Sequence, residues 1–255
     1  MDGDGMRRLR GRFVGLAREY AVRLGEGRAH IDLKRDHSLR VHALASKIVA
    51  GEGLPRPDLY LAAALLHDIG RFPQFERFGT YRDDVSVDHG DEGTSFLREN
   101  GFLDGFSQPD RDCLLEVVRL HNKRELPDGM EPVARSVCEV VRDADKLDIV
   151  PVVLSAMAVD GPPDPVVTLG LADEPDAWTP SVLEVVEGGA SPVYTDLRYM
   201  NDFKLLLASW GPKLVHRSSR RLFTARGCLD RIFATLPDIP RFESLKAALD
   251  EALGR

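Results

Sequence analysis

The chain has 255 residues, enough to bury a sizeable core as one large domain or two small ones. Hydrophobic residues make up 43% of it and charged residues 29%, which excludes disorder along the whole chain. A formal net charge of −7 argues against a protein that coats nucleic acid non-specifically, and an aromatic content of 7% offers no obvious platform for stacking bases. The composition therefore carries no strong signal for a nucleic-acid partner, while a local basic groove stays open.

The cysteines and the apolar runs bear on the compartment. The three cysteines form no C-x-x-C pair, and their odd number gives no closed disulfide framework, so reduced buried thiols are expected. The longest uncharged apolar run, 149–159, falls short of the roughly 20 residues that a membrane span needs. The first residues lack the apolar stretch of a secretory signal. These features predict a cytoplasmic protein with no membrane partner.

Apolar residues at helical spacing predict a succession of helices in the first 150 residues. Gly25 and Gly51 supply stop signals for the first two, and Gly70 and Pro73 close the third. Asp88 or Ser86 is expected to cap the fourth. The predicted helices cover residues 13–24, 41–49, 59–66, 88–100, 112–121 and 132–150.

The region 160–192 breaks this regularity, because it holds six of the sixteen prolines. Within it, Thr179 and Pro180 predict the start of one short helix that ends at Gly188. The region is either a long surface excursion or a lid over a site. Further helices are expected at 196–210, 213–236 and 240–253. No strand alternation or internal repeat is present, so we predict an all-α fold. We divide it into an N-terminal helix (1–29), a helical core (30–150), and an irregular segment followed by a C-terminal helical extension that packs on the core (151–255).

Six of the seven histidines precede residue 122, and four of them fall on the apolar faces of four different predicted helices. Burying four imidazoles is costly unless something compensates, and a shared transition-metal site does so. The other three, His30, His42 and His216, are interpreted as structural or solvent-facing. The four inward-facing histidines are His37, His67, His89 and His121.

A carboxylate should accompany these imidazoles. Asp68 directly follows one histidine at the last turn of a helix, from where it can flank one metal or lie between two. In the predicted helix 132–150, Asp145 lies at the edge of the apolar face, Asp148 lies nearby and Asp143 points the opposite way. Spacing therefore favours Asp145, then Asp148, while a solvated acidic helix end is the alternative interpretation.

The order H…HD…D formed by these residues resembles the HD-domain superfamily of metal-dependent phosphohydrolases. The segment 67–72, HDIGRF, is similar to the HDIG-K/R segment of that family, and 144–147, ADKL, is similar to its A-D-K/R-L helix. The resemblance covers about residues 30–150. It implies an all-α, HD-domain-like helical bundle, in agreement with the periodicity.

The resemblance also implies a ligand set. In binuclear members two further histidines lie between the HD pair and the last aspartate, and His89 and His121 occupy that place. Asp68 would then bridge two divalent transition-metal ions; Mn, Fe, Co, Ni and Zn suit such a mixed set, and Mg is an alternative. The number of ions, one or two, stays open, as does the choice among the three aspartates of helix 132–150. The implied metal ligands are His37, His67, Asp68, His89, His121 and Asp145.

By the same resemblance, a metal-activated water attacks phosphorus while nearby cations neutralise the phosphoryl oxygens. Asp68 and Arg71 are the expected catalytic residues, since Arg71 matches the family's phosphate-contacting Lys or Arg. Lys123 and Lys146 follow ligands directly and are further candidates for substrate binding. Each of these three cations could instead be a surface charge. Asp36 could orient the next imidazole or cap the helix.

The predicted function is therefore hydrolysis of a nucleotide or another small phosphate ester. No Walker loop, G-x-S-x-G elbow or cysteine beside a base is present, so covalent catalysis is not indicated. The alternatives are an HD-like di-iron oxygenase and a non-catalytic signalling module. Specificity is expected to lie in a loop over 72–87 and in the region 160–192, neither of which names the substrate. The sequence does not indicate an oligomeric state.

Overall fold

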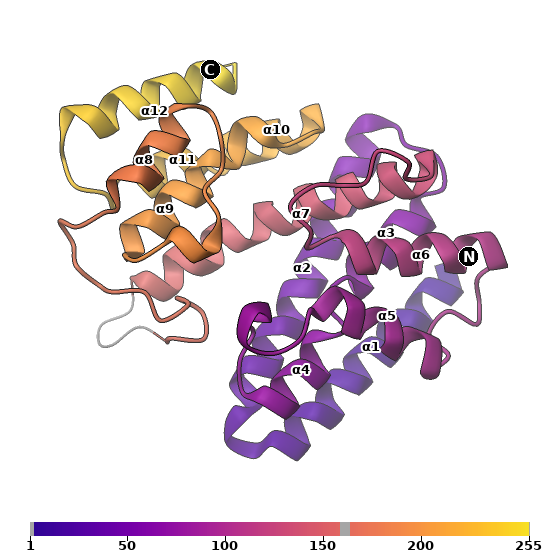
Figure 1. Ribbon diagram of the computed structural model, residues 1–255. Coiled ribbons are helices and arrows are strands. Elements are labelled where there is room, and N and C mark those ends of the chain that lie inside the picture. The colour runs from indigo at the N-terminus through magenta and orange to yellow at the C-terminus, as the bar shows by residue number, and fades with distance from the viewer. Residues whose placement is uncertain (1–2, 159–163, 255) are drawn as a thin grey trace. The chain divides into compact units, whose positions relative to one another are not determined.

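The computed structural model describes residues 3–158 and 164–254, and it divides the chain into two compact units, Met1–Asp148 and Ile149–Arg255 (Figure 1). The predicted all-α class is confirmed: the described residues form helices and no β-strand, with one isolated bridge between Ala172 and Tyr199. None of the described helices combines the length and apolarity needed to cross a membrane. The three-part domain division drawn from the sequence stays a prediction.

The first unit is built around α3, a short helix that is apolar on every side. Apart from Tyr60, alanine and leucine fill it from Leu59 to Leu66, and all but Leu61 are buried because α1, α2 and α6 pack against it. Phe13 of α1 and Phe72 of α4 add an aromatic contact with ring centroids 5.6 Å apart. The helices of this unit are α1 (Gly3–Leu24), α2 (Arg28–Glu52), α3 (Pro57–Leu66), α4 (Arg71–Phe78), α5 (His89–Glu99), α6 (Gln108–Leu120) and the first part of α7 (Pro132–Met157).

The second unit is centred on α9, which α8 and α11 contact. The buried carboxylate of Asp202 ties its elements together, because it accepts hydrogen bonds from the backbone and hydroxyl of Thr179 and from the backbone of Arg198 and Tyr199. The helices of this unit are the rest of α7, α8 (Pro180–Glu187), α9 (Met200–Ser209), α10 (Arg217–Ala225), α11 (Cys228–Phe233) and α12 (Pro240–Ala252).

Three expectations about individual elements were wrong. The helix expected at 213–236 is divided into α10 and α11, because Gly227 adopts a left-handed conformation with φ of 60°. The loop expected at 72–87 contains α4 and a 3-10 turn at Asp83–Val85, since Pro73 lies in the first turn of α4, where proline is tolerated. The helix that begins at Pro132 continues through Pro151 to Met157.

Other expectations agree with the structure. Asp88 caps α5 by accepting from the backbone amides of Gly90 and Asp91. Helix α8 begins at Pro180 as expected, although the hydroxyl of Thr179 donates to Asp202 instead of capping the helix. The proposed lid at 160–192 includes residues 160–163, which lie outside the described residues, and its role stays a prediction.

Candidate metal centre

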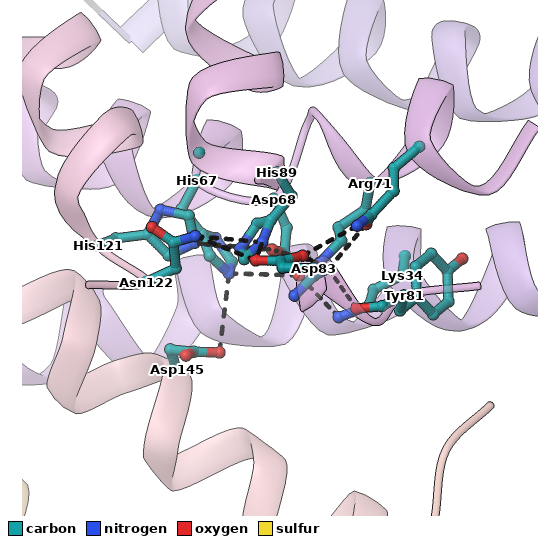
Figure 2. A network of polar contacts seen from close by, with 12 residues as sticks. Lys34, His67, Asp68, Arg71, Tyr81, Asp83, His89, His121, Asn122 and Asp145 are labelled. Atoms are coloured by element: carbon teal, nitrogen blue, oxygen red, sulfur yellow. Dashed lines mark hydrogen bonds and ion pairs between the residues drawn. The ribbon is translucent and has the colours of Figure 1, made fainter. Parts of the chain in front are cut away.

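The six residues expected to bind metal lie in or directly after five helices of the first unit, and their side chains gather at one place. Figure 2 labels all of them except His37. His37 lies in the middle of α2, and His67 and Asp68 directly follow α3. The remaining three are His89 at the start of α5, His121 at the end of α6 and Asp145 in α7. All but Asp145 are buried, with at most 6% of the residue surface exposed. The structure therefore joins residues that are up to 108 positions apart in the sequence.

Two glycines allow these helix ends to approach. A Cβ atom on Gly70 would lie 2.2 Å from the carbonyl oxygen of His89, so the turn after α3 packs directly on the start of α5. A Cβ atom on Gly90 would lie 2.8 Å from the carbonyl oxygen of Arg119, so the start of α5 packs on the end of α6. These contacts bring His89 beside both Asp68 and His121, and any larger residue would separate them.

The hydrogen bonds of the imidazoles determine which ring nitrogen faces the centre. Nδ1 of His67 lies 2.8 Å from the carbonyl oxygen of Ala64, and Nδ1 of His121 lies 2.7 Å from that of Val118. A carbonyl only accepts, so each Nδ1 carries the hydrogen and each Nε2 presents a lone pair in the neutral ring.

The other two histidines are held by carboxylates. Nδ1 of His37 lies 2.8 Å from Oδ2 of Asp148, and Nδ1 of His89 lies 2.6 Å from Oδ2 of Asp83. Because an ionised carboxylate also only accepts, all four imidazoles direct Nε2 to the same place. The Nε2 atoms of His37 and His67 are buried there without a hydrogen bond of good geometry, although Oδ1 of Asp145 lies 3.0 Å and 3.8 Å from them. Such a set of converging lone pairs is the arrangement that a cation requires.

Asp68 lies between two pairs of histidines. Its Oδ2 is 3.6 Å from Nε2 of His37 and 3.8 Å from Nε2 of His67. Its Oδ1 is 3.3 Å from Nε2 of His89 and 3.7 Å from Nε2 of His121. One carboxylate thus faces a different histidine pair with each oxygen, which is the geometry of a bridging ligand.

Ligand atoms that lie within 4.8 Å of one another form two triads that could each hold a metal ion. The first joins His37, His67 and Asp145, and the second joins His67, Asp68 and His121. His89 belongs to neither triad, but its Nε2 lies 3.0 Å from Nε2 of His121. Two nitrogen lone pairs at that distance repel each other unless a proton or a cation lies between them.

The three aspartates of α7 have different surroundings. Asp145 directs Oδ1 to within 3.0 Å of Nε2 of His37, and its side chain is 22% exposed. Asp148 is buried and contacts His37 through the opposite ring nitrogen, while also accepting two hydrogen bonds from Arg40. Asp143 is buried too and belongs to neither triad. Interpreting the run as a solvated helix end was therefore wrong for Asp143 and Asp148.

The electrostatics of the site favour ionised carboxylates. Burial by itself would raise the pKa of Asp68, but Lys34 and His67 reverse this and hold it well below its usual range. Burial likewise opposes ionisation of Asp145, whose pKa is held well below the usual range by hydrogen bonds with His37 and His67. Both groups are therefore charged at neutral pH and suited to divalent cations.

The imidazoles differ in their affinity for protons. Burial, with Arg71 nearby, lowers the pKa of His89 to about 3, and burial also lowers the pKa of His121. Burial would lower the pKa of His37 as well, but hydrogen bonds with Asp145 and Asp148 outweigh it and raise the pKa. A metal would therefore compete with a proton mainly at His37.

Arg71 lies beside the six residues, as expected. Its Nη1 donates to Oε1 of Gln74 at 2.7 Å and to Oδ1 of Asp83 at 2.7 Å, and its Nε lies 3.5 Å from Oδ1 of Asp68. That Nε is buried and has no hydrogen-bond partner. The guanidinium is thus fixed in place with its Nε–H still available.

The two lysine candidates lie elsewhere. The ammonium of Lys123 contacts Asp88, the cap of α5, and lies 3.6 Å from Asp91. The ammonium of Lys146 lies 3.5 Å from the carbonyl oxygen of Arg142. Within the described chain neither contacts the six residues. Asp36 pairs with Arg35, and the role of orienting His37 belongs to Asp148.

Two residues that contact the six were not identified from the sequence. Lys34, one turn before His37 in α2, donates to Oδ2 of Asp68 at 2.9 Å. Asp83, in the turn after α4, contacts both His89 and Arg71. The spacing of Lys34 and His37, three residues apart on one helix, is the signal that places them on the same face. No comparable signal exists for Asp83.

Comparison with known protein families decides the identity of the first unit. A family model described as HD domain matches residues 35–150, the stretch that contains all six clustered residues. This stretch, residues 35–150, is an HD domain. The all-α fold and the clustered histidines and aspartates of this HD domain agree with that assignment. No match was found among curated proteins or among solved structures.

Family membership carries a general expectation. HD domains are mostly metal-dependent hydrolases, and the family binds divalent metals. The match covers the HD domain alone, so it says nothing about the second unit.

Proposed function

We propose that this protein is a metal-dependent phosphohydrolase that acts on a nucleotide or another small phosphate ester. The single observation that carries the proposal is the convergence of the Nε2 atoms of four histidines on the two oxygens of Asp68. Membership of the HD-domain superfamily supports the reaction class.

The donor set fits a pair of divalent transition metals. Imidazole nitrogen with carboxylate oxygen suits Mn, Fe, Co, Ni or Zn, and Mg remains an alternative for the carboxylates. His37, His67 and Asp145 would hold one ion, His89 and His121 would hold the other, and Asp68 would contribute an oxygen to each. When bound, such ions lower the pKa of a coordinated water and polarise phosphoryl oxygens.

The chain's own residues orient these ligands and the substrate. Asp148 and Asp83 accept from Nδ1 of His37 and His89, which fixes both rings and leaves Nε2 free to coordinate. The buried Nε of Arg71, which lacks an acceptor, is available to a phosphoryl oxygen beside Asp68. Because Gln74 and Asp83 hold Arg71 in place, little side-chain entropy is lost when the substrate binds.

The test is metal analysis of freshly purified protein, paired with a phosphate-release screen over nucleotides and small phosphate esters with Mn²⁺ added. We expect close to two metal ions per chain and turnover of at least one ester. Two irons with oxygen uptake and no phosphate release would instead identify a di-iron oxygenase. No metal and no turnover after reconstitution would indicate a non-catalytic module.

Two histidines provide a matched pair of variants. His121→Ala removes an Nε2 ligand and should abolish turnover and lower metal content. His42→Ala, in α2, removes a ring whose Nδ1 faces the carbonyl oxygen of Leu61 at 3.0 Å, and should leave both unchanged. Equal effects of the two substitutions would contradict the proposed site.

A further inference from the structure

Lys34 is a partly buried cation whose one carboxylate partner in the described chain is itself a proposed metal ligand. Its side chain is 19% exposed, and its ammonium donates to Oδ2 of Asp68 at 2.9 Å. Within the described chain this is the one carboxylate that Lys34 contacts. An ammonium that is largely withdrawn from water is stabilised by a nearby counter-charge.

Coordination by Asp68 changes this balance. The Oδ2 atom that accepts from Lys34 is also the atom that faces His37 and His67. Once that carboxylate serves as a metal ligand, its charge is shared with the ion and no longer balances Lys34. The ammonium then needs another anion at the same place.

Tyr81 lies beside the two cations that could bind that anion. The ammonium of Lys34 lies 5.1 Å from the centre of the Tyr81 ring, and the guanidinium of Arg71 lies 5.7 Å from it. The Tyr81 hydroxyl donates to the carbonyl oxygen of His30 at 2.8 Å, which restrains the ring. Figure 2 shows Lys34, Tyr81 and Arg71 together beside Asp68, on the side away from His121.

The two cations differ in their remaining bonding capacity. The guanidinium of Arg71 is partly neutralised by Asp83, yet its Nε has no acceptor. The ammonium of Lys34 has three hydrogens, and one bond to Asp68 leaves two of them for a ligand. Together they offer donors from two directions to an anion with several oxygens.

We propose that Lys34 is a substrate-binding residue that, with Arg71, binds a phosphoryl dianion once Asp68 is engaged by metal. This inference rests on the proposed function and narrows its substrate to phosphate monoesters, because two cations match a dianion better than the monoanion of a diester. Lys34 thereby determines specificity, and the anion site exists only in the metal-loaded protein.

The test measures binding of inorganic phosphate by calorimetry to protein loaded with Mn²⁺, so it does not depend on turnover. Lys34→Met should weaken phosphate binding at least tenfold without changing metal content, and Lys34→Arg should restore most of it. Lys47→Met is the matched control, because Lys47 is an exposed lysine of the same helix, and it should change nothing.

A second readout uses turnover where an ester substrate has been found. Lys34→Met should raise KM for a monoester more than it lowers kcat, and it should affect diesters less. Unchanged phosphate binding in Lys34→Met would overturn the inference, and so would loss of metal from that variant, since Lys34 would then only hold Asp68. Absence of phosphate binding by the metal-loaded wild type would overturn it too. Phosphate binding that depends on Lys34 without hydrolysis of any ester would leave the inference standing and refute the proposed function.

Discussion

The two units bury polar groups in opposite ways. In the second unit the buried carboxylate of Asp202 is satisfied by four donors from Thr179, Arg198 and Tyr199. In the HD domain, Nε2 of His37 and His67 are buried with carboxylate oxygens nearby but no hydrogen bond of good geometry. Polar burial that is fully satisfied within the chain contributes to the fold, whereas unsatisfied polar burial around one carboxylate indicates a ligand.

The largest difference in effect should be found between substitutions of two buried aspartates, Asp68 in the HD domain and Asp202 in the second unit. Asp68→Asn keeps the shape but removes the charge, so metal should be lost and turnover should fall at least about a thousandfold, with the helical circular dichroism retained. Asp202→Ala should lower the free energy of unfolding by about 3 kcal/mol by leaving buried donors unpaired, while an intact HD domain keeps its metal. Metal loss in both variants would refute the distinction between the units.

A second pair of substitutions compares glycines. Gly70→Ala places a methyl group against the backbone of His89 and should cost about 3 kcal/mol of stability as well as metal affinity, since His89 must move. Gly227→Ala meets no neighbouring atom and only strains a positive φ, so about 1 kcal/mol is expected, without a change in metal affinity. Thermal unfolding and metal titration of both variants would check this. Equal losses of stability would mean that close packing at Gly70 is not the constraint.

Most of the residues that gather in the HD domain could be predicted from the sequence, because helical periodicity is a local property of the chain. Four histidines with apolar residues four and seven positions away were expected to face inward, and all four are buried. The placement of Asp145 at the edge of the apolar face of α7 also agrees with its partial exposure and its contact with His37. Their role as metal ligands stays a prediction.

The parts that could not be predicted depend on tertiary contacts. Asp83 contacts His89 from a turn that has no periodic pattern. The role of Lys34 depends on its contact with Asp68, which directly follows α3 and is distant in the sequence. Asp148 was ranked second to Asp145, because spacing along a helix does not reveal which ring nitrogen of His37 a carboxylate contacts. The break at Gly227 depends on a backbone conformation that glycine permits but does not dictate.

Metal removal should change the stability of the two units differently, and a buried cysteine in each unit can report this difference. Cys138 in the HD domain and Cys228 in the second unit are both fully buried, and burial raises the pKa of the two thiols to about 12 and about 11. Both should therefore react only through opening of the structure. Metal at a hundred times its Kd stabilises the unit that binds it by about 2.7 kcal/mol.

Chelation should therefore speed thiol labelling of Cys138 up to about a hundredfold and leave the rate for Cys228 unchanged. Mass spectrometry of the labelled peptides with and without chelator provides the measurement. If both cysteines accelerate equally, the two units open together, and the contrast between them does not extend to stability.

The smallest expected effect concerns the residue that orients a proposed ligand. Asp148→Asn removes the charge that holds the hydrogen on Nδ1 of His37 and should weaken metal binding about 10–100-fold. Asp143→Asn changes another buried aspartate of α7 that belongs to neither triad, so any effect should fall on stability alone. Competition titrations with a metal indicator would compare the two. A weaker metal affinity in Asp143→Asn than in Asp148→Asn would contradict this assignment. It would mean that Asp143, and not Asp148, is the aspartate of α7 that supports the metal ligands.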